Sequence, residues 1–349
     1  MTEAQKHRPA CRLLKPAPRP IPKGLSGPRL SAIQLLRSKW ANGTVLTYHF
    51  LAGVNWEWAE LQKDVVRKAF ATWKSLGIGL DFREVDNPIN ATVRIGFLQG
   101  DGSWSYVGTD LLHNADPDGR NMNFGWSLTD AGGWATALHE TGHAIGFEHE
   151  HQNPNSGLVW NEEAVYEYFE KTPNEWSRDQ TLYNIIRKLA VSEVVGSNWD
   201  PTSIMHYHFE VGLIAAPQHY RDFGIPENTS LSSNDIAWVR RFFPPLAAAV
   251  EVKAGDTVQI ASASGAQTNF ALMADKSGEF MLKTSGPADT LIVLNEEKDG
   301  QLMQVAASDD SGSPQNAEIR ITLQPGRRYF AQVRTNYAEP GSAVAFSFV

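Results

Sequence analysis

The segment that most constrains the fold is an eleven-residue run, His139-Glu140-Thr141-Gly142-His143-Ala144-Ile145-Gly146-Phe147-Glu148-His149. Residues four positions apart lie on one face of an α-helix, so the imidazoles of His139 and His143 can bind one metal ion. Gly146 can adopt positive φ, which ends the helix and lets the chain turn back to bring His149 to the same ion. The run therefore predicts a helix with a three-histidine zinc site.

The same run predicts hydrolytic chemistry. Three neutral imidazoles leave one coordination position for water, and zinc lowers the pKa of such a water towards neutrality. Glu140 lies beside the metal and can accept the proton of that water. An isolated HExxH pattern also arises on exposed helices that bind nothing, but the added Gly146 and His149 favour the zinc interpretation. His151, two positions beyond the run, is not expected to be a ligand.

The pattern HExxHxxGxxH resembles that of the metzincin clan of zinc peptidases, and Gly146 to Glu150 resembles the version found in the astacin family. A second motif, Ser203-Ile204-Met205-His206-Tyr207, is similar to the astacin Met-turn. The resemblance covers roughly residues 39–245. It implies an α+β metzincin-type zincin domain with a mixed sheet and an active-site helix, and a zinc-dependent endopeptidase that acts on peptides or proteins.

The resemblance also implies roles for individual residues. Glu140 is expected to act as general base and then acid, and Met205 to lie beneath the zinc. Tyr207 is expected to be a displaceable fifth metal ligand that donates a hydrogen bond to the tetrahedral intermediate. An ordinary core methionine and an ordinary aromatic residue are the alternatives for Met205 and Tyr207. Glu150 receives no role, although the family uses this position to contact a trimmed N-terminus.

Composition changes along the chain and divides it into three parts. All eleven Trp and all ten His precede residue 240, whereas the sequence after Pro245 has neither. We expect a Pro-rich, basic tail or pro-segment at 1–38, the peptidase domain at 39–245, and a further domain at 246–349. Periodicity predicts strands at 44–51, 80–85, 92–98 and 122–126, and helices at 56–76, 134–147, 162–171, 176–189 and 232–243.

The last part predicts a small all-β sandwich. Short alternating runs at 250–252, 257–261, 291–294, 319–323 and 330–333 are separated by turn clusters. The turn and strand motifs resemble the bacterial pre-peptidase C-terminal domain, a resemblance that favours an extracellular location, although no signal peptide is readable. Asp309 and Asp310 are candidates for a calcium site, but a solvated loop is the favoured interpretation of two acids in a Gly/Ser turn.

Two further features bear on substrates and regulation. Residues 102–108 resemble the metzincin edge strand, along which a peptide adds by main-chain hydrogen bonds; a capped edge that binds nothing is the alternative. Cys11 is the only cysteine, which excludes an intrachain disulfide. Thiolate is a strong zinc ligand, so Cys11 is a candidate fourth ligand of a latent form, and an incidental thiol in a tail is the alternative.

Charge and hydropathy exclude other classes of protein. The net charge of −8 disfavours a nucleic-acid partner, and the apolar stretches are far too short for a membrane span. An active zinc endopeptidase remains the favoured function. The alternative is a catalytically silent zinc-fold binding or adhesive module, whose expected mark is a missing glutamate or ligand. That mark is absent from the motifs, so the sequence favours catalysis.

Overall fold

The computed structural model describes residues 9–16, 39–52, 59–113, 119–189, 198–245, 248–263, 265–298, 301–308, 316–338 and 341–349. The described residues form two compact units, one drawn from 1–18, 46–76 and 82–241 and the other from 19–45, 77–81 and 242–349. The boundaries predicted at 38 and 245 stay predictions. Most of the predicted tail, and the candidate calcium residues Asp309 and Asp310, lie outside the described residues.

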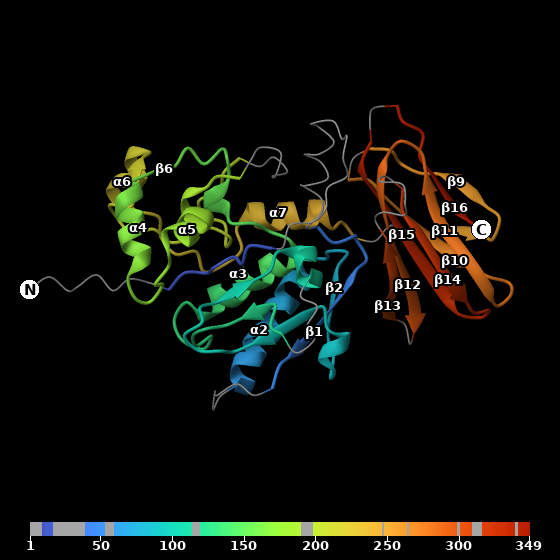
Figure 1. Ribbon diagram of the computed structural model, residues 1–349, viewed down its shortest axis with the longest axis horizontal. Helices are drawn as coiled ribbons and strands as arrows, with labels where there is room; N and C mark the ends of the chain where they lie inside the picture. The colour runs from blue at the N-terminus through green and yellow to red at the C-terminus, as the bar shows by residue number, and fades with distance from the viewer. Residues whose placement is uncertain are drawn as a thin grey trace, which may run out of the picture. The chain divides into compact units, whose positions relative to one another are not determined.

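The first unit is organised around a mixed five-stranded sheet with the order β2-β1-β3-β5-β4 (Figure 1). Its strands are β1 (Val45–Phe50), β2 (Asp81–Glu84), β3 (Val93–Gly96), β4 (Trp104–Ser105) and β5 (Met122–Asn123). Strands β1, β3 and β5 run parallel, and β4 pairs antiparallel with β5. The α+β class and the mixed sheet are confirmed, and β4 is the sheet edge predicted at 102–108.

Helix α2 (Ala59–Ser75) carries an apolar stripe that packs against the active-site helix α3 (Gly133–Ile145) (Figure 1). Val66, Phe70 and Trp73 recur at helical spacing and are almost fully buried. The indole Nε1 of Trp73 also donates to Thr141 Oγ1 on α3 over 3.1 Å. The stripe therefore fixes α3 both by apolar burial and by a directional contact.

The remaining elements of this unit are short. Helices α4 (Glu162–Glu170) and α7 (Ser233–Phe242) lie where helices are predicted. Helix α6 (Gln218–Phe223) and the small antiparallel sheet of β6 (Val159–Trp160) with β7 (Ile214–Ala216) are not predicted. Short 3₁₀ helices occupy Pro88–Asn90, Gly108–His113 and Glu150–Gln152. None of the helices in the described ranges is long and apolar enough to cross a membrane.

The single helix predicted at 176–189 is wrong. A capping box of Ser177 and Gln180 starts α5 (Arg178–Thr181), but the next turn, Leu182–Ile186, is a π-helix. It ends where the Arg187 amide donates to Leu182 O over 2.8 Å. The side chain of Gln152 donates to the carbonyls of Tyr183 and Arg187, at 2.8 and 2.9 Å, and stabilises this wider turn. Tertiary contacts therefore override the α-helical pattern.

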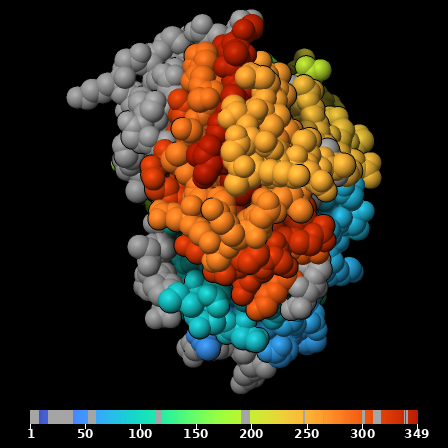
Figure 2. Space-filling view, turned by 90° about the vertical axis from the view of Figure 1, so that its right-hand side faces the viewer, coloured from blue at the N-terminus to red at the C-terminus, as the bar shows by residue number. Residues whose placement is uncertain are grey.

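The second unit contains an all-β sandwich of two sheets, as predicted. One sheet has the order β13-β12-β15-β10-β8 and the other β14-β11-β16-β9. The strands are β8 (Val250–Lys253), β9 (Thr257–Gln259), β10 (Gln267–Met273), β11 (Gly278–Ser285), β12 (Asp289–Lys298), β13 (Gln301–Ser308), β14 (Glu318–Leu323), β15 (Arg328–Tyr337) and β16 (Ala345–Phe348). Strands β10, β11, β13 and β16 are not among the predicted ones. Figure 2 shows the surface of these strands in yellow-orange to red.

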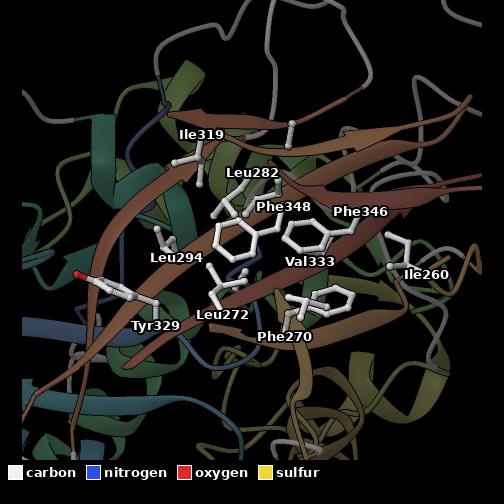
Figure 3. Packing of buried hydrophobic residues seen from close by; sticks show 14 of the residues in the cluster. Ile260, Phe270, Leu272, Leu282, Leu294, Ile319, Tyr329, Val333, Phe346 and Phe348 are labelled. Carbon is white, nitrogen blue, oxygen red and sulfur yellow. The ribbon is translucent and has the colours of Figure 1, made fainter. Parts of the chain in front are cut away.

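The sandwich core is built from one face of each sheet (Figure 3). Phe270 of β10 and Phe346 of β16 stack across it with ring centroids 4.5 Å apart and planes 14° apart. Both rings are at most 1% exposed. This stacked pair joins the two sheets at the centre of the core.

Replacing Phe346 by Ala should therefore destabilise the sandwich by about 3–5 kcal/mol, the usual cost of removing a buried phenyl ring. Urea unfolding followed by far-UV circular dichroism measures the loss, because no tryptophan lies after residue 240 to report it by fluorescence. Met273→Ala, on β10 but 45% exposed, is the control and should change stability by less than about 0.5 kcal/mol. Equal effects in the two variants would contradict the role of the pair.

Candidate active site

Helix α3 carries the first part of the site and ends where the sequence predicts a reversal. It stops at Ile145, and Gly146 adopts a φ of 117°, which an L side chain rarely allows. The amides of Gly146 and Phe147 donate to Gly142 O at 3.2 and 3.1 Å, which satisfies the end of the helix. The chain then turns back and brings His149 beside α3.

The three predicted histidines converge. His143 Nε2 lies 3.0 Å from His139 Nε2 and 3.1 Å from His149 Nε2. The Cys11 thiol joins them, and its Sγ and the ring nitrogens all lie within 4.8 Å of one another. All four residues are buried.

The hydrogen bonds of the second ring nitrogens show that this cluster suits a cation. His139 Nδ1 contacts the Ile204 carbonyl at 2.8 Å, and His143 Nδ1 contacts the Phe147 carbonyl at 2.6 Å. A carbonyl only accepts, so both Nδ1 atoms carry the proton and both Nε2 atoms present lone pairs. Two acceptors 3.0 Å apart repel each other in a dry site unless a cation lies between them. The donor set, imidazole nitrogens with a thiol, is one that zinc prefers.

Burial keeps the imidazoles in the metal-binding form. Desolvation lowers the pKa of His139 to about 4 and lowers the pKa values of His143 and His149 well below the ordinary value. Their neighbouring rings add to the effect for His143 and His149. All three rings are therefore neutral at pH 7, as metal ligation requires.

Glu140 lies on α3 beside the cluster and is fully buried. Its Oε2 accepts from the Cys11 thiol at an S–O distance of 3.4 Å, whereas Oε1 has no hydrogen-bond partner among the residues that the structure describes. Desolvation raises the pKa of Glu140 to about 8, an effect that the Cys11 contact partly offsets. A carboxyl with a pKa near neutrality is suited to accept and return a proton.

Residues 9–16 form neither a helix nor a strand and lie in the site, with Cys11 only 7% exposed. The amide of Arg12 donates to Ser103 O, next to edge strand β4, over 3.1 Å. The Tyr207 hydroxyl donates to the main-chain carbonyl of Cys11. Burial, the Glu140 carboxylate and the hydrogen bond to it raise the pKa of the Cys11 thiol well above its ordinary value, whereas a bound cation would favour the thiolate.

The predicted Met-turn lies directly against α3. Met205 is 2% exposed, and a Cβ on Gly142 would lie 2.5 Å from its Sδ. Buried Asp235 of α7 holds the turn, since its carboxylate accepts from Ser203 Oγ at 2.6 Å and from the Ile204 amide at 2.9 Å. Asp235 thereby fixes the carbonyl of Ile204 that orients His139.

His151 and Glu150 follow the last histidine and do not join the cluster. His151 Nε2 donates to the carbonyl of Asn184 in the π-helix over 2.8 Å. Glu150 Oε1 accepts from the Asp200 amide at 2.9 Å and from Asn153 Nδ2 at 3.0 Å. Burial raises the pKa of Glu150 to about 7. Both residues therefore tie the loop after His149 to neighbouring segments.

Three residues near the site were not predicted: Asp235, Asn184 and Asn174. Asn184 Oδ1 accepts from the Leu13 amide at 2.8 Å, and Asn174 Oδ1 accepts from the Ala10 amide at 2.9 Å. A lone Asn carries no spacing signal, whether it lies in a helical stretch as Asn184 does or in a turn as Asn174 does, so only the fold reveals these contacts. Asp235 has a weak signal, because it lies three positions after Ser232 in a capping arrangement.

A cavity of about 120 Å³ lies beside the histidines. Its lining includes His139 and Glu140 of α3, the aromatic rings of Trp126 and Phe169, and the carboxylate-bearing Glu227. Ala10 and Cys11 of the segment 9–16 line it as well. The cavity therefore continues the cleft in which the segment lies.

A mixed sheet, a helix with two histidines, a third histidine after a glycine turn and a methionine turn beneath them define a zincin of the metzincin type. The model of the Astacin peptidase family matches residues 32–213, just over half of the chain. The chain belongs to the astacin family, and the prediction of an astacin-like metallopeptidase is confirmed.

Individual relatives match to different extents. The chain is 28% identical over 152 residues to protein SpAN of Strongylocentrotus purpuratus, an overlap of 42% of this chain and 21% of SpAN. It thus spans about a fifth of that relative's length. The structure of myroilysin is 30% identical, with a TM-score of 0.53, over 60% of this chain and 97% of that one.

The C-terminal unit has a weaker match. The pre-peptidase C-terminal domain of a Bacillus anthracis collagenase is 15% identical over 29% of this chain and 95% of that domain, with a TM-score of 0.24. A score this low supports no argument about function. The resemblance of residues 246–349 to such domains, and the extracellular location that it favours, stay predictions.

The close approach of Gly142 to Met205 generates a prediction. Gly142→Ala adds a methyl group where the Met205 sulfur lies, so it should destabilise the domain by about 1–3 kcal/mol despite the better helix propensity of Ala. Urea unfolding with tryptophan fluorescence measures the change. In a Met205→Ala background the same substitution should cost much less, because the obstacle is gone. An equal cost in both backgrounds would show that packing against Met205 is not the cause.

Proposed function

We propose that this chain is a zinc-dependent endopeptidase whose form with residues 9–16 in the cleft is latent. The observation that carries the proposal is the convergence of three imidazole nitrogens, a buried carboxylate and a main-chain segment at one point. His139, His143 and His149 would hold the zinc ion. When bound, zinc supplies Lewis acidity that lowers the pKa of a coordinated water and polarises a carbonyl group.

Glu140 supplies the proton transfer. Its carboxylate lies beside the histidine cluster, and one of its buried oxygens has no partner in the described part of the chain. It can accept the proton of the attacking water and pass it to the leaving amine of the peptide. Burial, which raises its pKa to about 8, strengthens it as a base.

Tyr207 supplies a hydrogen bond to the reacting carbonyl. Its hydroxyl donates to the main-chain carbonyl of Cys11, so the phenol reaches a peptide oxygen in the cleft. A donor aimed at a carbonyl oxygen stabilises the negative charge that develops there during attack. Desolvation raises the pKa of Tyr207 well above its ordinary value, which keeps the hydroxyl protonated as a donor.

Substrates are peptides or proteins that add along the sheet edge. The carbonyl of Ser103, beside β4, accepts the Arg12 amide at 3.1 Å, which is the contact that an added peptide strand makes. The segment 9–16 therefore occupies the place of a substrate. Its Cys11 thiol, 3.4 Å from Glu140 and 3.5 Å from His143 Nε2, lies where a fourth ligand would block water.

The role of Glu140 predicts that Glu140→Gln keeps zinc, because the residue is no ligand, but lowers kcat by at least about 10²-fold. The measurement combines zinc content with hydrolysis of a quenched fluorescent peptide, in a Cys11→Ser background. Glu163→Gln, which changes an exposed glutamate of α4, is the control and should leave kcat unchanged. Full activity of the Glu140 variant would contradict the proposed mechanism.

The role of Tyr207 predicts a different kinetic pattern. Tyr207→Phe removes a hydroxyl but little volume, so kcat should fall by about 10²–10³ while KM stays nearly constant. The Cys11→Ser background is again used, because Tyr207 also contacts the Cys11 carbonyl. Tyr166→Phe on α4 serves as the matched control. An unchanged kcat would make Tyr207 a structural residue.

The latent form predicts a comparison of three proteins: the full-length chain, its Cys11→Ser variant and a chain that begins at Lys39. We expect the full-length chain to be inactive and both altered forms to hydrolyse peptides in a zinc-dependent manner. Without the thiol, water can occupy the fourth position, and without the segment the cleft is open. Equal activity of all three proteins would leave Cys11 without a regulatory role.

A further inference from the structure

The main-chain groups of the segment in the cleft are bound by the protein rather than left to solvent. The amides of Ala10, Arg12 and Leu13 donate to Asn174, Ser103 and Asn184, and the Cys11 carbonyl accepts from Tyr207. These contacts involve main-chain groups of the segment and none of its side chains. Any peptide that follows the same path can therefore make them.

Asn184 is the most firmly fixed of these partners. Its side chain is 2% exposed, and its Nδ2 donates to Gln180 O over 3.0 Å. That bond fixes which end of the amide faces the cleft, and leaves Oδ1 to accept the Leu13 amide at 2.8 Å. The acceptor is thus set in place by the protein itself.

The backbone around Asn184 explains why this residue reaches the cleft. Asn184 lies at the centre of the π-helix Leu182–Ile186, and single π turns inside helices occur frequently at functional sites. Its carbonyl accepts from His151 Nε2 at 2.8 Å, and the neighbouring Tyr183 carbonyl accepts from Gln152 Nε2. The π turn is therefore bonded to the loop that carries His149.

We propose that Asn184 is a substrate-positioning residue that accepts a main-chain N–H of the bound peptide. The proposal rests on the proposed peptidase function. Cys11 lies beside Glu140 and His143, so the backbone two residues further along occupies the place of a substrate close to its scissile bond. The same acceptor then serves the segment in the latent form and the substrate in the active form.

The contact can be tested in the full-length, zinc-loaded chain without measuring activity. Amide hydrogen exchange at single-residue resolution should show protection at Leu13 that is lost in Asn184→Ala and kept in Asn184→Asp, whose carboxyl retains an acceptor at this position. The Asn174→Ala variant is the matched control, and it should release the Ala10 amide and leave Leu13 protected. Unchanged exchange at Leu13 in Asn184→Ala would overturn the assigned contact.

The role in catalysis is tested with N-methylated substrates in the Cys11→Ser background. Methylation of the amide that Asn184 binds should raise KM by about 3–10-fold in the parent, the typical effect of one neutral hydrogen bond, with little change in kcat. In Asn184→Ala, the penalty at that one position should vanish while the penalties at other positions persist. In Asn174→Ala, the penalty at the Asn184 position should remain.

The outcomes separate the two proposals. If Asn184 only supports the fold, Asn184→Ala will lower the rates of all substrates alike and every methylation penalty will persist, which overturns the positioning role. If the Cys11→Ser chain binds zinc but hydrolyses nothing, the proposed function fails. The exchange experiment still decides whether Asn184 holds a peptide backbone in this cleft, because it needs no turnover.

Discussion

The site depends on one electrostatic constraint, which is that the imidazoles of His139 and His143 must present lone pairs to one point in a dry interior. An imidazole exposes a bare Nε2 when Nδ1 holds the proton, and a buried N–H then needs an acceptor. His139 takes the carbonyl of Ile204, and His143 takes the carbonyl of Phe147. The chain after α3 and the distant Met-turn are therefore held where these carbonyls are needed.

The positions of the carbonyl acceptors depend in turn on the packing of the neighbouring elements. The Met-turn can offer the Ile204 carbonyl because Asp235 binds the Ile204 amide and the Ser203 hydroxyl from the first turn of α7. The turn can approach α3 closely because Gly142 has no side chain facing Met205. Trp73 of α2 closes the other side by its bond to Thr141. The conformation of the imidazoles thus depends on α2, on α7 and on Gly142, which lies between the two helical histidines.

The sequence predicted the parts of the site that have a fixed spacing. The helical histidines, Glu140, the stop at Gly146 and the Met-turn follow local rules, and the structure places each beside the others. Asn184 and Asp235 escaped prediction because their partners are distant in sequence and no rule links them. The π turn escaped because Leu182–Ile186 has the same apolar spacing as an α-helix, and contacts from Gln152 decide between the two.

The C-terminal strands show a related limit. Strand β12 was predicted at 291–294 and spans Asp289–Lys298, because polar residues at both of its ends also pair with neighbouring strands, and Asp289 and Thr290 are buried although they are polar. Strand β13 was missed altogether, since it pairs along only one edge with β12 and its Met303 and Val305 are exposed. Alternation of hydrophobic residues reports burial on one face, and a strand such as β13, whose apolar side chains are at least partly exposed, gives little of this signal.

The peptide in the cleft belongs to the same chain as the histidines, which changes how strongly it needs to bind. A tethered ligand competes at an effective concentration set by its linker, often millimolar for a short flexible one, whatever the protein concentration. A few main-chain hydrogen bonds and one thiol are then enough to keep the segment bound in nearly all molecules. In the proposed latent form, a single cut between the segment and the domain would replace that local concentration by the bulk one, so inhibition would be lost by dilution without any change in the contacts themselves.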